Sequence, residues 1–211
     1  MKDIVIIGAG GFADEVLFLI EDINKKSSSW NFKGFVNQTS EPPHRSDKLL
    51  FGTEEDLIKH PSPIHVVIGI GTPKIIEKIF NKLSSCTHIT FPNLLHPSFI
   101  YHSSLNLGSG NIICANNIFT TNIIVGNCNI FNLNCTYGHD INIGSFNVFN
   151  PGINGSGGVV IGNKNLVGTG STLLQYTALK NNNILGAGAV LTKSYASDQT
   201  LVGIPAKPLK T

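Results

Sequence analysis

A large apolar residue recurs at every sixth position between Leu107 and Leu191. Fourteen of the fifteen positions in this series are large and apolar, and Gly155 is the exception. A period of six matches neither the 3.6-residue turn of an α-helix nor the alternation of a strand. It is typical of a parallel β-helix, in which one apolar side chain per hexad points into a narrow prism and residues eighteen apart stack. The inward positions are Leu107, Ile113, Phe119, Val125, Phe131, Tyr137, Ile143, Phe149, Gly155, Ile161, Val167, Leu173, Leu179, Leu185 and Leu191.

The first part of the chain, residues 1–92, lacks this period. One-sided apolar patterns predict helices over residues 12–25 and 73–83, the second with Pro73 at its start. Strands that alternate with helices indicate a small parallel sheet, so we expect a Rossmann-like α/β domain. The predicted strands are residues 3–7, 33–36, 65–69 and 88–91. The β-helix then covers residues 93–194, and residues 195–211 form a tail that loses the repeat.

Charge and cysteine content exclude several classes of protein. The 211 residues carry a formal net charge of +2 and only 13% are charged, so nothing suggests binding to nucleic acid or to a membrane surface. No apolar run has the length of a membrane span or a signal peptide. The four cysteines form no CxxC pair and resemble small buried hydrophobes in a reducing compartment. We therefore expect a soluble cytoplasmic protein.

Asparagine dominates the polar positions of the repeat. Eighteen asparagines lie between Asn106 and Asn183. Asparagine tolerates the left-handed backbone conformation and forms hydrogen bonds with neighbouring peptide groups. We therefore expect these residues to build the tight corners of the β-helix, which is a structural role.

A glycine-rich turn, Gly8-Ala9-Gly10-Gly11, follows the first predicted strand and opens the first helix. Backbone N–H groups at such a turn and at the helix N-terminus bind phosphate well, although glycine turns after strands are also common without a ligand. Ala13 takes the place of the third glycine of the dinucleotide fingerprint. Asn37 stands where an NAD-binding domain carries an acid, so a sugar nucleotide fits this turn better than a dinucleotide.

His139 and Asp140 are the strongest candidates for catalysis. His139 is the only histidine after His102, and Asp140 is the only acid between Glu77 and Asp198. A lone histidine is often structural, but a charged acid has no packing role in so apolar a repeat. A carboxylate that orients an imidazole makes it a better general base. Adjacent residues can touch only at a corner of the prism, so we expect the pair there.

Gly157 lies eighteen residues after His139, one coil further on in the same position. The segment around it, Gly155-Ser156-Gly157-Gly158, contains the single break in the inward apolar series. Bare backbone above the histidine predicts a cleft that admits a thioester, with the Gly157 N–H donating to its carbonyl oxygen. The alternative is a plain glycine bulge without a ligand.

Together these residues carry a family resemblance. The chain resembles the bacterial N-acetyltransferases of nucleotide-linked aminosugars, which are left-handed β-helix enzymes with hexapeptide repeats and have relatives that O-acetylate sialic acids. The matching pieces are Gly8-Ala-Gly-Gly11, Gly34-Phe-Val-Asn37, Val67-Ile-Gly-Ile-Gly71, Leu95-His-Pro-Ser98, His139-Asp140 with Ile143-Gly144, Ser156-Gly157, Gly186-Ala-Gly-Ala189 and Gly203-Ile-Pro-Ala-Lys207.

The resemblance implies a function for both domains. It makes the protein an acetyl-CoA-dependent N-acetyltransferase that needs no metal, with His139 as the base, Asp140 as its partner and the Gly157 N–H as the carbonyl donor. The acceptor is expected to be the amino group, at C4, of a UDP- or dTDP-linked deoxysugar for surface polysaccharide or glycan synthesis. The implied acetyl-CoA contacts are Gly157, Gly158, Gly186, Ala187, Gly203, Ile204 and Lys207. The implied nucleotide-sugar contacts are Gly8, Gly10, Gly11, Phe12, Asn37, Gly69 and Gly71.

The chain departs from the family pattern at three positions. Phe12 and Val148 stand where many members have histidine, and Asn37 stands where many have aspartate. The first and third bear on the nucleotide and the sugar, and Val148 bears on how the acceptor is held near the thioester. None of these departures removes the proposed base.

Three other functions compete with this hypothesis. A sugar O-acetyltransferase would use the same base. A zinc enzyme of the carbonic anhydrase kind needs three converging histidines, and the coils after His102 offer only His139. A non-catalytic scaffold would lose only stability when His139 is removed.

Apolar residues also precede many inward positions, and these side chains point outward. Only one side chain per hexad fits the prism, so we expect the outward residues to meet another surface. Packing of three prisms in a homotrimer, with acetyl-CoA held between subunits as in the family, would bury them. The residues are Ile112, Ile118, Ile124, Ile130, Val148, Val160, Leu166, Ile184 and Val190.

Overall fold

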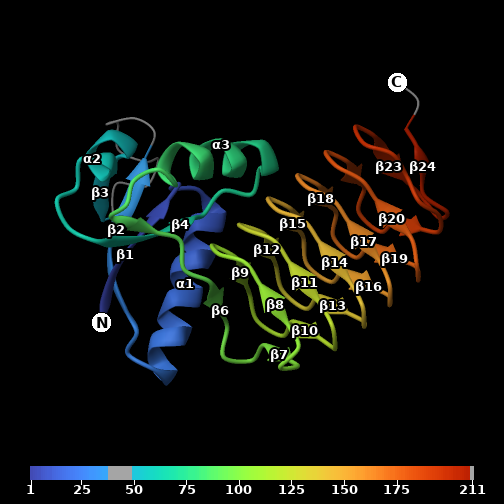
Figure 1. The fold of residues 1–211 in the computed structure, drawn as a ribbon, viewed down its shortest axis with the longest axis horizontal. Helices are drawn as coiled ribbons and strands as arrows, with labels where there is room; N and C mark the ends of the chain where they lie inside the picture. Colours follow the sequence, from blue (N-terminus) through green and yellow to red (C-terminus); the bar gives the residue numbers. More distant parts are fainter. Residues whose placement is uncertain (38–48, 210–211) are drawn as a thin grey trace.

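The computed structural model describes residues 1–37 and 49–209 of the chain. An α/β domain is followed by a left-handed parallel β-helix whose coils extend away from it (Figure 1). The last strands, β23 and β24, lie at the far end of the coils from the α/β domain. No helix in the described ranges is both long and apolar enough to cross a membrane. The fold class expected from the hexad period and the resemblance is confirmed.

The α/β domain is built on a five-stranded parallel sheet with the order β3-β2-β1-β4-β5. The pattern of residues 1–92 predicts four of these strands and both longer helices. It misses β3 and the short helix α2, which begins with a capping box between Thr53 and Asp56. The elements are β1 (Lys2–Ile7), α1 (Gly11–Lys26), β2 (Trp30–Asn37), β3 (Leu50–Thr53), α2 (Glu54–Ile58), β4 (Ile64–Ile68), α3 (Pro73–Leu83) and β5 (Ile89–Thr90).

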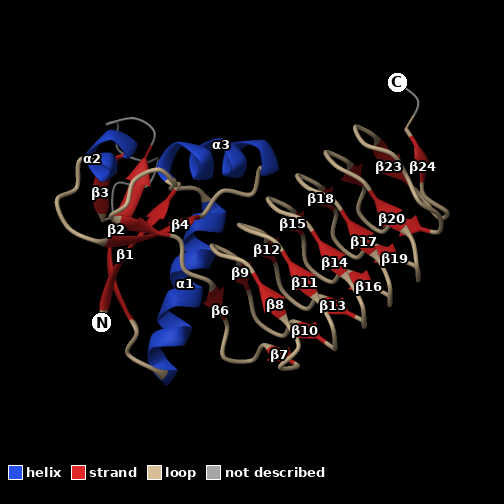
Figure 2. Cartoon of the chain, viewed as in Figure 1, coloured by secondary structure: helices blue, strands red, loops and turns tan. Residues whose placement is uncertain are grey.

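The β-helix consists of three sheets of very short strands, which Figure 2 shows stacked side by side. A six-stranded sheet contains β7 (Ile100–Tyr101), β10 (Ile118–Phe119), β13 (Thr136–Tyr137), β16 (Asn154–Gly155), β19 (Thr172–Leu173) and β22 (Val190–Leu191). A five-stranded sheet contains β8 (Asn106–Leu107), β11 (Ile124–Val125), β14 (Asn142–Ile143), β17 (Val160–Ile161) and β20 (Ala178–Leu179).

The third sheet has eight strands and continues into the tail. Its strands are β6 (Leu94–Leu95), β9 (Ile112–Ile113), β12 (Ile130–Phe131), β15 (Val148–Phe149), β18 (Leu166–Val167), β21 (Ile184–Leu185), β23 (Thr200–Val202) and β24 (Lys207–Pro208). The tail was expected to lose the repeat, yet Ile184 pairs with Thr200 and Leu201 is buried. The spacing drops from eighteen to sixteen there, which hides the strand from a search for hexads. Residues 210–211 of the predicted tail lie outside the described residues.

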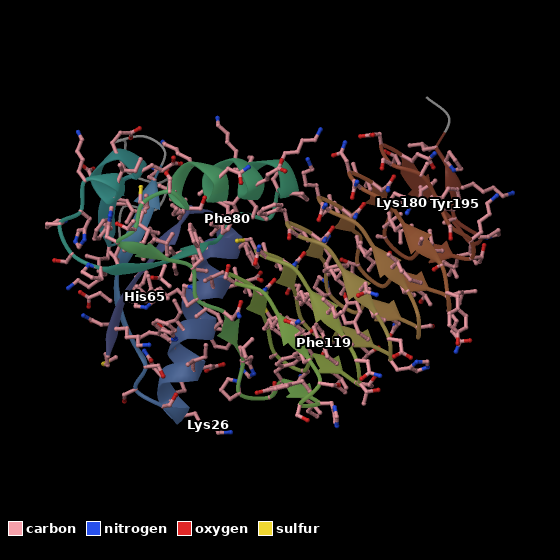
Figure 3. The ribbon with its side chains drawn as sticks, in the orientation of Figure 1. Lys26, His65, Phe80, Phe119, Lys180 and Tyr195 are labelled. Atoms are coloured by element: carbon pink, nitrogen blue, oxygen red, sulfur yellow. The ribbon has the colours of Figure 1, made fainter. Side chains whose placement is uncertain are left out.

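The interior of the coils follows the predicted series. Register partners such as Ile118 and Thr136 are eighteen residues apart, and the inward residues from Ile113 to Leu191 are buried, whereas Leu107 is partly buried. Phe119, labelled inside the coils in Figure 3, meets the Phe131 ring at a centroid distance of 4.9 Å. The apolar series is therefore the core of the β-helix.

The asparagines are structural, as expected. Asn129 and Asn147 are fully buried, and each donates its backbone N–H to the side-chain oxygen of the asparagine eighteen residues earlier. Others, such as Asn116 and Asn134, occupy corners with positive φ. The repeat thus satisfies its buried backbone groups with stacked amides.

The α/β domain packs directly on the eight-stranded sheet. Ile112, Ile130 and Val148 are buried in the same apolar cluster as the helices of that domain, and Leu166 is partly buried against it. The expectation that these outward residues meet a neighbouring subunit is therefore wrong, because their own chain covers them. The Phe80 ring of α3 lies 5.6 Å from the Phe146 ring at this junction.

Candidate active site

One edge of the prism carries the predicted catalytic pair. We call the corner residues between the six-stranded and five-stranded sheets the His139 edge; it includes Thr121-Asn122, His139-Asp140 and Gly157-Gly158 in successive coils. The φ of Asp140 is +58°, which turns the chain so that both side chains project from the corner. His139 Nδ1 lies 2.8 Å from Asp140 Oδ2, so the expected contact is present. The two side chains are 51% and 58% exposed, which leaves them open to ligands.

Asn122 holds the carboxylate of Asp140 from the preceding coil. Its Nδ2 donates to Asp140 Oδ1 at 3.0 Å, and the Asp140 N–H donates to the Thr121 carbonyl at 3.0 Å. The Asn122 N–H in turn donates to Ser104 Oγ at 2.8 Å. Sequence reasoning missed Asn122; its spacing of eighteen residues from Asp140 was the available signal.

The hydrogen bonds to Asp140 favour the ionised form of its carboxylate. The pKa of Asp140 is lowered from its ordinary 3.8, first by the hydrogen bond from Asn122 and then by that from His139. The carboxylate therefore stays ionised at all pH values above its lowered pKa, and its favourable contacts are lost only as the pH falls through that value. An ionised carboxylate can only accept a hydrogen bond, so Asp140 favours the neutral imidazole that carries its proton on Nδ1. Nε2 of His139 is then left without a proton and can take one.

The imidazole of His139 rests against the backbone of Gly157 in the next coil. A Cβ at Gly157 would lie 2.5 Å from Nε2 and 2.7 Å from Cε1 of His139, so a side chain there would displace the ring. Within residues 1–37 and 49–209, the Gly157 N–H has no hydrogen-bond acceptor, whereas the Gly158 N–H donates to the His139 carbonyl at 2.8 Å. Nε2 of His139 thus lies against a buried glycine whose N–H is unpaired in those ranges, and an acyl transfer site needs a base and such a donor close together.

Gly155 has a packing role that the sequence did not reveal. A Cβ there would lie 2.8 Å from Cδ1 of Tyr137, because the buried Tyr137 ring fills the space one coil below. The break in the apolar series therefore compensates for a large neighbour. The proposed opening at Gly155 is occupied by the tyrosine ring. Gly157 is buried, and Ser156 and Gly158 are partly exposed.

The glycines predicted to bind a nucleotide sugar converge at one end of the α/β sheet. Gly8 follows β1 with a φ of +106°, and a Cβ there would lie 2.9 Å from the Gly69 carbonyl at the end of β4. Gly10 and Gly71 have open space around them, and Gly10 is the N-cap of α1.

Strand order reverses between β1 and β4, which is where parallel α/β sheets bind ligands beyond the carboxyl ends of their strands. The other three predicted positions lie at the same end of the sheet. They are Gly11, the first residue of α1; Phe12, which is partly buried; and Asn37, the last residue of β2.

The remaining predicted acetyl-CoA residues lie in the last coils. Gly186 and Ala187 follow β21, and a Cβ at Gly186 would lie 2.9 Å from Val202, next to Gly203. Ile204 and Lys207 are exposed in the β23–β24 hairpin. Gly186 belongs to the edge between the eight-stranded and six-stranded sheets, so a single chain does not bring it to the His139 edge.

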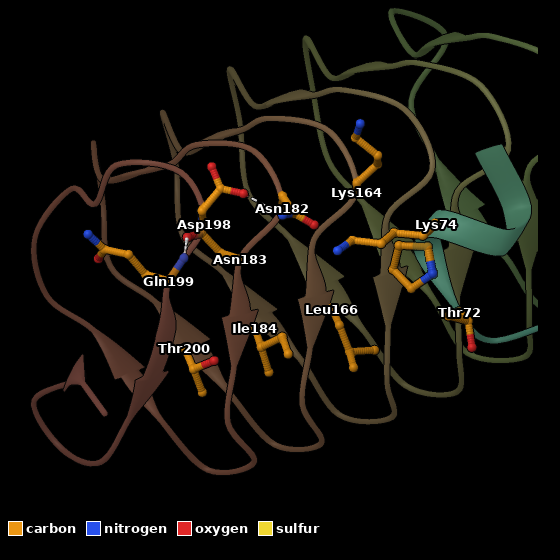
Figure 4. Close-up of a pocket in the computed structure, with 11 residues that line it drawn as sticks. Thr72, Lys74, Lys164, Leu166, Asn182, Asn183, Ile184, Asp198, Gln199 and Thr200 are labelled. Atoms are coloured by element: carbon orange, nitrogen blue, oxygen red, sulfur yellow. Dashed lines mark hydrogen bonds between the residues drawn. The ribbon is translucent and has the colours of Figure 1, made fainter. Parts of the chain in front are cut away.

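A cleft of about 320 Å³ lies between the start of α3 and the last coils, on a third edge of the prism (Figure 4). Lys74, Lys164 and Asp198 are among the residues that line it. None of the residues predicted for either ligand lines this cleft, so it is separate from the candidate active site.

Both parts of the chain are similar to known proteins. Residues 3–83 match the family model described as the PglD N-terminal domain. The chain superposes on solved structures along its whole length. It superposes on the acetyltransferase domain of PglB from Neisseria gonorrhoeae with a TM-score of 0.88 and 25% identity, over 99% of this chain and 100% of that one. A search of curated protein sequences found no match.

Two further structures show the same fold. PerB from Caulobacter crescentus, in complex with CoA and GDP-perosamine, gives a TM-score of 0.89 at 22% identity and covers 100% of this chain and 98% of its own. WeeI from Acinetobacter baumannii gives 0.88 at 24% identity and covers 99% and 100%. The gonococcal domain has also been solved with acetyl coenzyme A. The resemblance stated from the sequence is confirmed, and the matches support the expected class of acetyl-CoA-dependent enzyme.

Proposed function

We propose that this protein transfers the acetyl group of acetyl-CoA to the amino group of a nucleotide-linked aminosugar, at C4 of a UDP- or dTDP-linked deoxysugar. The observation that carries the proposal is the position of His139: its Nδ1 is held by Asp140 and its Nε2 lies against the Gly157 backbone. The PglD N-terminal domain match and the likeness to PerB, which was solved with CoA and GDP-perosamine, support the substrate class.

The reaction assigns a task to each group on the His139 edge. The sugar amine attacks the thioester carbonyl, which forms the C–N bond, and the N–H of Gly157 donates to the oxygen as it becomes negative. His139 Nε2 takes the proton that the nitrogen loses, and Asp140 stabilises the imidazolium. The C–S bond then breaks, and CoA leaves with its sulfur receiving that proton.

The α/β domain would hold the nucleotide part of the acceptor. The N–H groups of Gly10 and Gly11 suit the phosphates, because they lie at the start of a helix, whereas the Gly8 N–H donates to the Val36 carbonyl at 2.9 Å. Gly71 is exposed at the end of β4, next to the buried Gly69, and Phe12 and Asn37 lie at the same end of the sheet for contacts with the base or sugar. The product would serve surface polysaccharide or glycan synthesis in the cytoplasm, where nucleotide sugars are the donors.

We further propose a homotrimer with acetyl-CoA bound between subunits. The proposal is supported by the exposure of His139 and by the placement of Gly157 and Gly186 on different edges, which two chains could bring together. Ile118, Ile124 and Val160 expose large apolar surfaces on the two sheets that meet at the His139 edge. Light scattering that shows a monomer at micromolar concentration would refute this assembly.

The function is tested with a panel of UDP-, dTDP- and GDP-linked 4-amino sugars and acetyl-CoA, with mass spectrometry of the products. We expect one acetyl group on the amine of a UDP- or dTDP-linked sugar. Matched sugars with a hydroxyl in place of the amine are the control, and acetylation of those alone would make the enzyme an O-acetyltransferase. A panel without any acetylated product would refute the proposal. Thermal shifts with each sugar and with CoA report binding independently of turnover.

A further inference from the structure

Corner positions with a left-handed backbone show a consistent pattern in this chain. Among residues 1–37 and 49–209, ten residues other than glycine have positive φ, and asparagine or aspartate occupies six of these positions. Those two residue types adopt this conformation readily, whereas other side chains pay a strain cost. The four others are Cys128, Phe146, Lys164 and Tyr176, with φ between +51° and +64°.

Three of the four contact the α/β domain or its junction. Cys128 is buried in the same cluster as Phe91. The ring of Phe146 lies 5.6 Å from the ring of Phe80, and Lys164 Nζ lies 3.1 Å from Glu77 Oε1. Packing or an ion pair with another part of the chain thus accounts for each of these three corner residues.

Tyr176 is the exception, and it lies on the His139 edge. It belongs to the coil after Gly157, where its N–H donates to the Gly157 carbonyl at 3.1 Å. Its ring lies on Gly158, so closely that a Cβ at Gly158 would collide with Cδ1. The residue is 75% exposed, and within the described ranges its hydroxyl has no hydrogen-bond partner. An aromatic ring in a strained conformation, exposed beside a candidate active site, points to a ligand.

The position of Tyr176 along the coils indicates which of the two proposed ligands would reach its ring. The α/β domain, where the nucleotide sugar is proposed to bind, packs on the eight-stranded sheet through Ile112, Ile130 and Val148, and Leu166 is partly buried against it. Tyr176 lies at the His139 edge instead, between β19 and β20 and one coil beyond Gly157, in the direction of the C-terminal coils that carry the other implied acetyl-CoA residues. If the thioester carbonyl accepts from the Gly157 N–H, the rest of the coenzyme extends past Tyr176.

We propose that Tyr176 binds the pantetheine arm of acetyl-CoA; this inference rests on the proposed function. The flat face of the ring would cover the methylene groups of the arm, and the hydroxyl would bond to one of its amides. Leu174, which is also exposed in the same coil, would extend the apolar surface.

The test is Tyr176→Asn, because asparagine occupies four equivalent corners and relieves the strain. We expect the calorimetric Kd for CoA and the KM for acetyl-CoA to rise about tenfold, with the acceptor KM unchanged. Tyr176→Phe should weaken CoA binding less. Tyr101→Asn, which removes an exposed tyrosine from a coil before His139, is the matched control and should leave the Kd unchanged.

The outcomes separate this inference from the proposed function. An unchanged Kd for CoA in Tyr176→Asn would overturn the role of Tyr176, even if the wild type acetylates aminosugars. A smaller assembly of this variant in light scattering would also overturn it, because the ring would then serve a subunit contact. Tight CoA binding that depends on Tyr176, in a wild type that acetylates no aminosugar, would uphold the inference and refute the proposed acceptor.

Discussion

Replacing Gly157 with alanine tests how closely the fold places the imidazole. The added Cβ would lie 2.5, 2.7 and 3.0 Å from Nε2, Cε1 and Cδ2 of His139, whereas ordinary contacts begin near 3.4 Å. The ring must therefore move by about 1 Å, and a misplacement of this size costs about 100-fold in rate. The backbone of Gly157 is not in the left-handed region, so alanine adds no strain of its own.

The expected effect is thus large on catalysis and small on stability. The imidazole is half exposed and can swing into water, so the free energy of unfolding should change by no more than about 0.5 kcal/mol. The assay follows release of the CoA thiol at saturating substrates, and urea unfolding measures stability.

The double variant His139→Ala/Gly157→Ala is the control for this prediction. Without the ring there is nothing to displace, so the second substitution should change the residual rate by less than about twofold. The reasoning fails if Gly157→Ala retains more than about half of the wild-type kcat, given the expected 100-fold loss. It also fails if Gly157→Ala costs as much in the absence of His139 as in its presence.

Three further predictions follow from named contacts. Asn122→Ala removes a hydrogen bond to the charged carboxylate of Asp140 and should lower kcat about tenfold with CoA binding intact; an unchanged kcat would contradict it. Tyr137→Phe removes a buried hydroxyl that has no hydrogen-bond partner among the described residues. It should raise the free energy of unfolding by about 1 kcal/mol in urea titrations, so destabilisation would be the contrary result. Gly10→Glu places a negative charge at the proposed phosphate site and should raise the acceptor KM but not that of acetyl-CoA; an equal acceptor KM would move the nucleotide elsewhere.

Much of the fold could be predicted because a single strong period controls it. One inward residue per hexad determines the register of every coil, so the positions from Ile113 to Leu191 could be assigned without knowledge of their contacts. The tail was missed because β23 pairs at a spacing of sixteen, and β3 and α2 because their short sequences carry no clear period. Periodicity thus identifies regular elements and fails where the register changes.

The surroundings of the catalytic pair were harder to predict than the pair itself. His139 and Asp140 are unusual residue types in this repeat, so composition alone singles them out. Asn122 and Tyr176 do not stand out in the same way, since asparagine fills many corners and one tyrosine among four carries no signal. Their importance depends on stacking across coils, which only the three-dimensional structure gives.

The outward apolar residues show why surface roles need a structure. Ile112 and Ile118 have the same pattern in the sequence, yet Ile112 is buried under the α/β domain and Ile118 is exposed. The path of residues 84–93 into the first coil determines which sheet of the β-helix packs against the α/β domain. The hexad period contains no information on that connection, so it could not separate contacts within the chain from contacts between chains.

The central claim is that His139 is the base of an acetyl transfer, and the kcat of His139→Ala tests it most directly. The measurement uses the best nucleotide-linked aminosugar of the panel at saturating acetyl-CoA, with the Kd for CoA and the assembly state determined on the same samples. A positioned base contributes about 100- to 10,000-fold, so kcat should fall by that factor while CoA binding and assembly are unchanged. A variant that keeps more than about a tenth of the wild-type kcat would contradict the account, since even the weakest positioned base contributes about 100-fold.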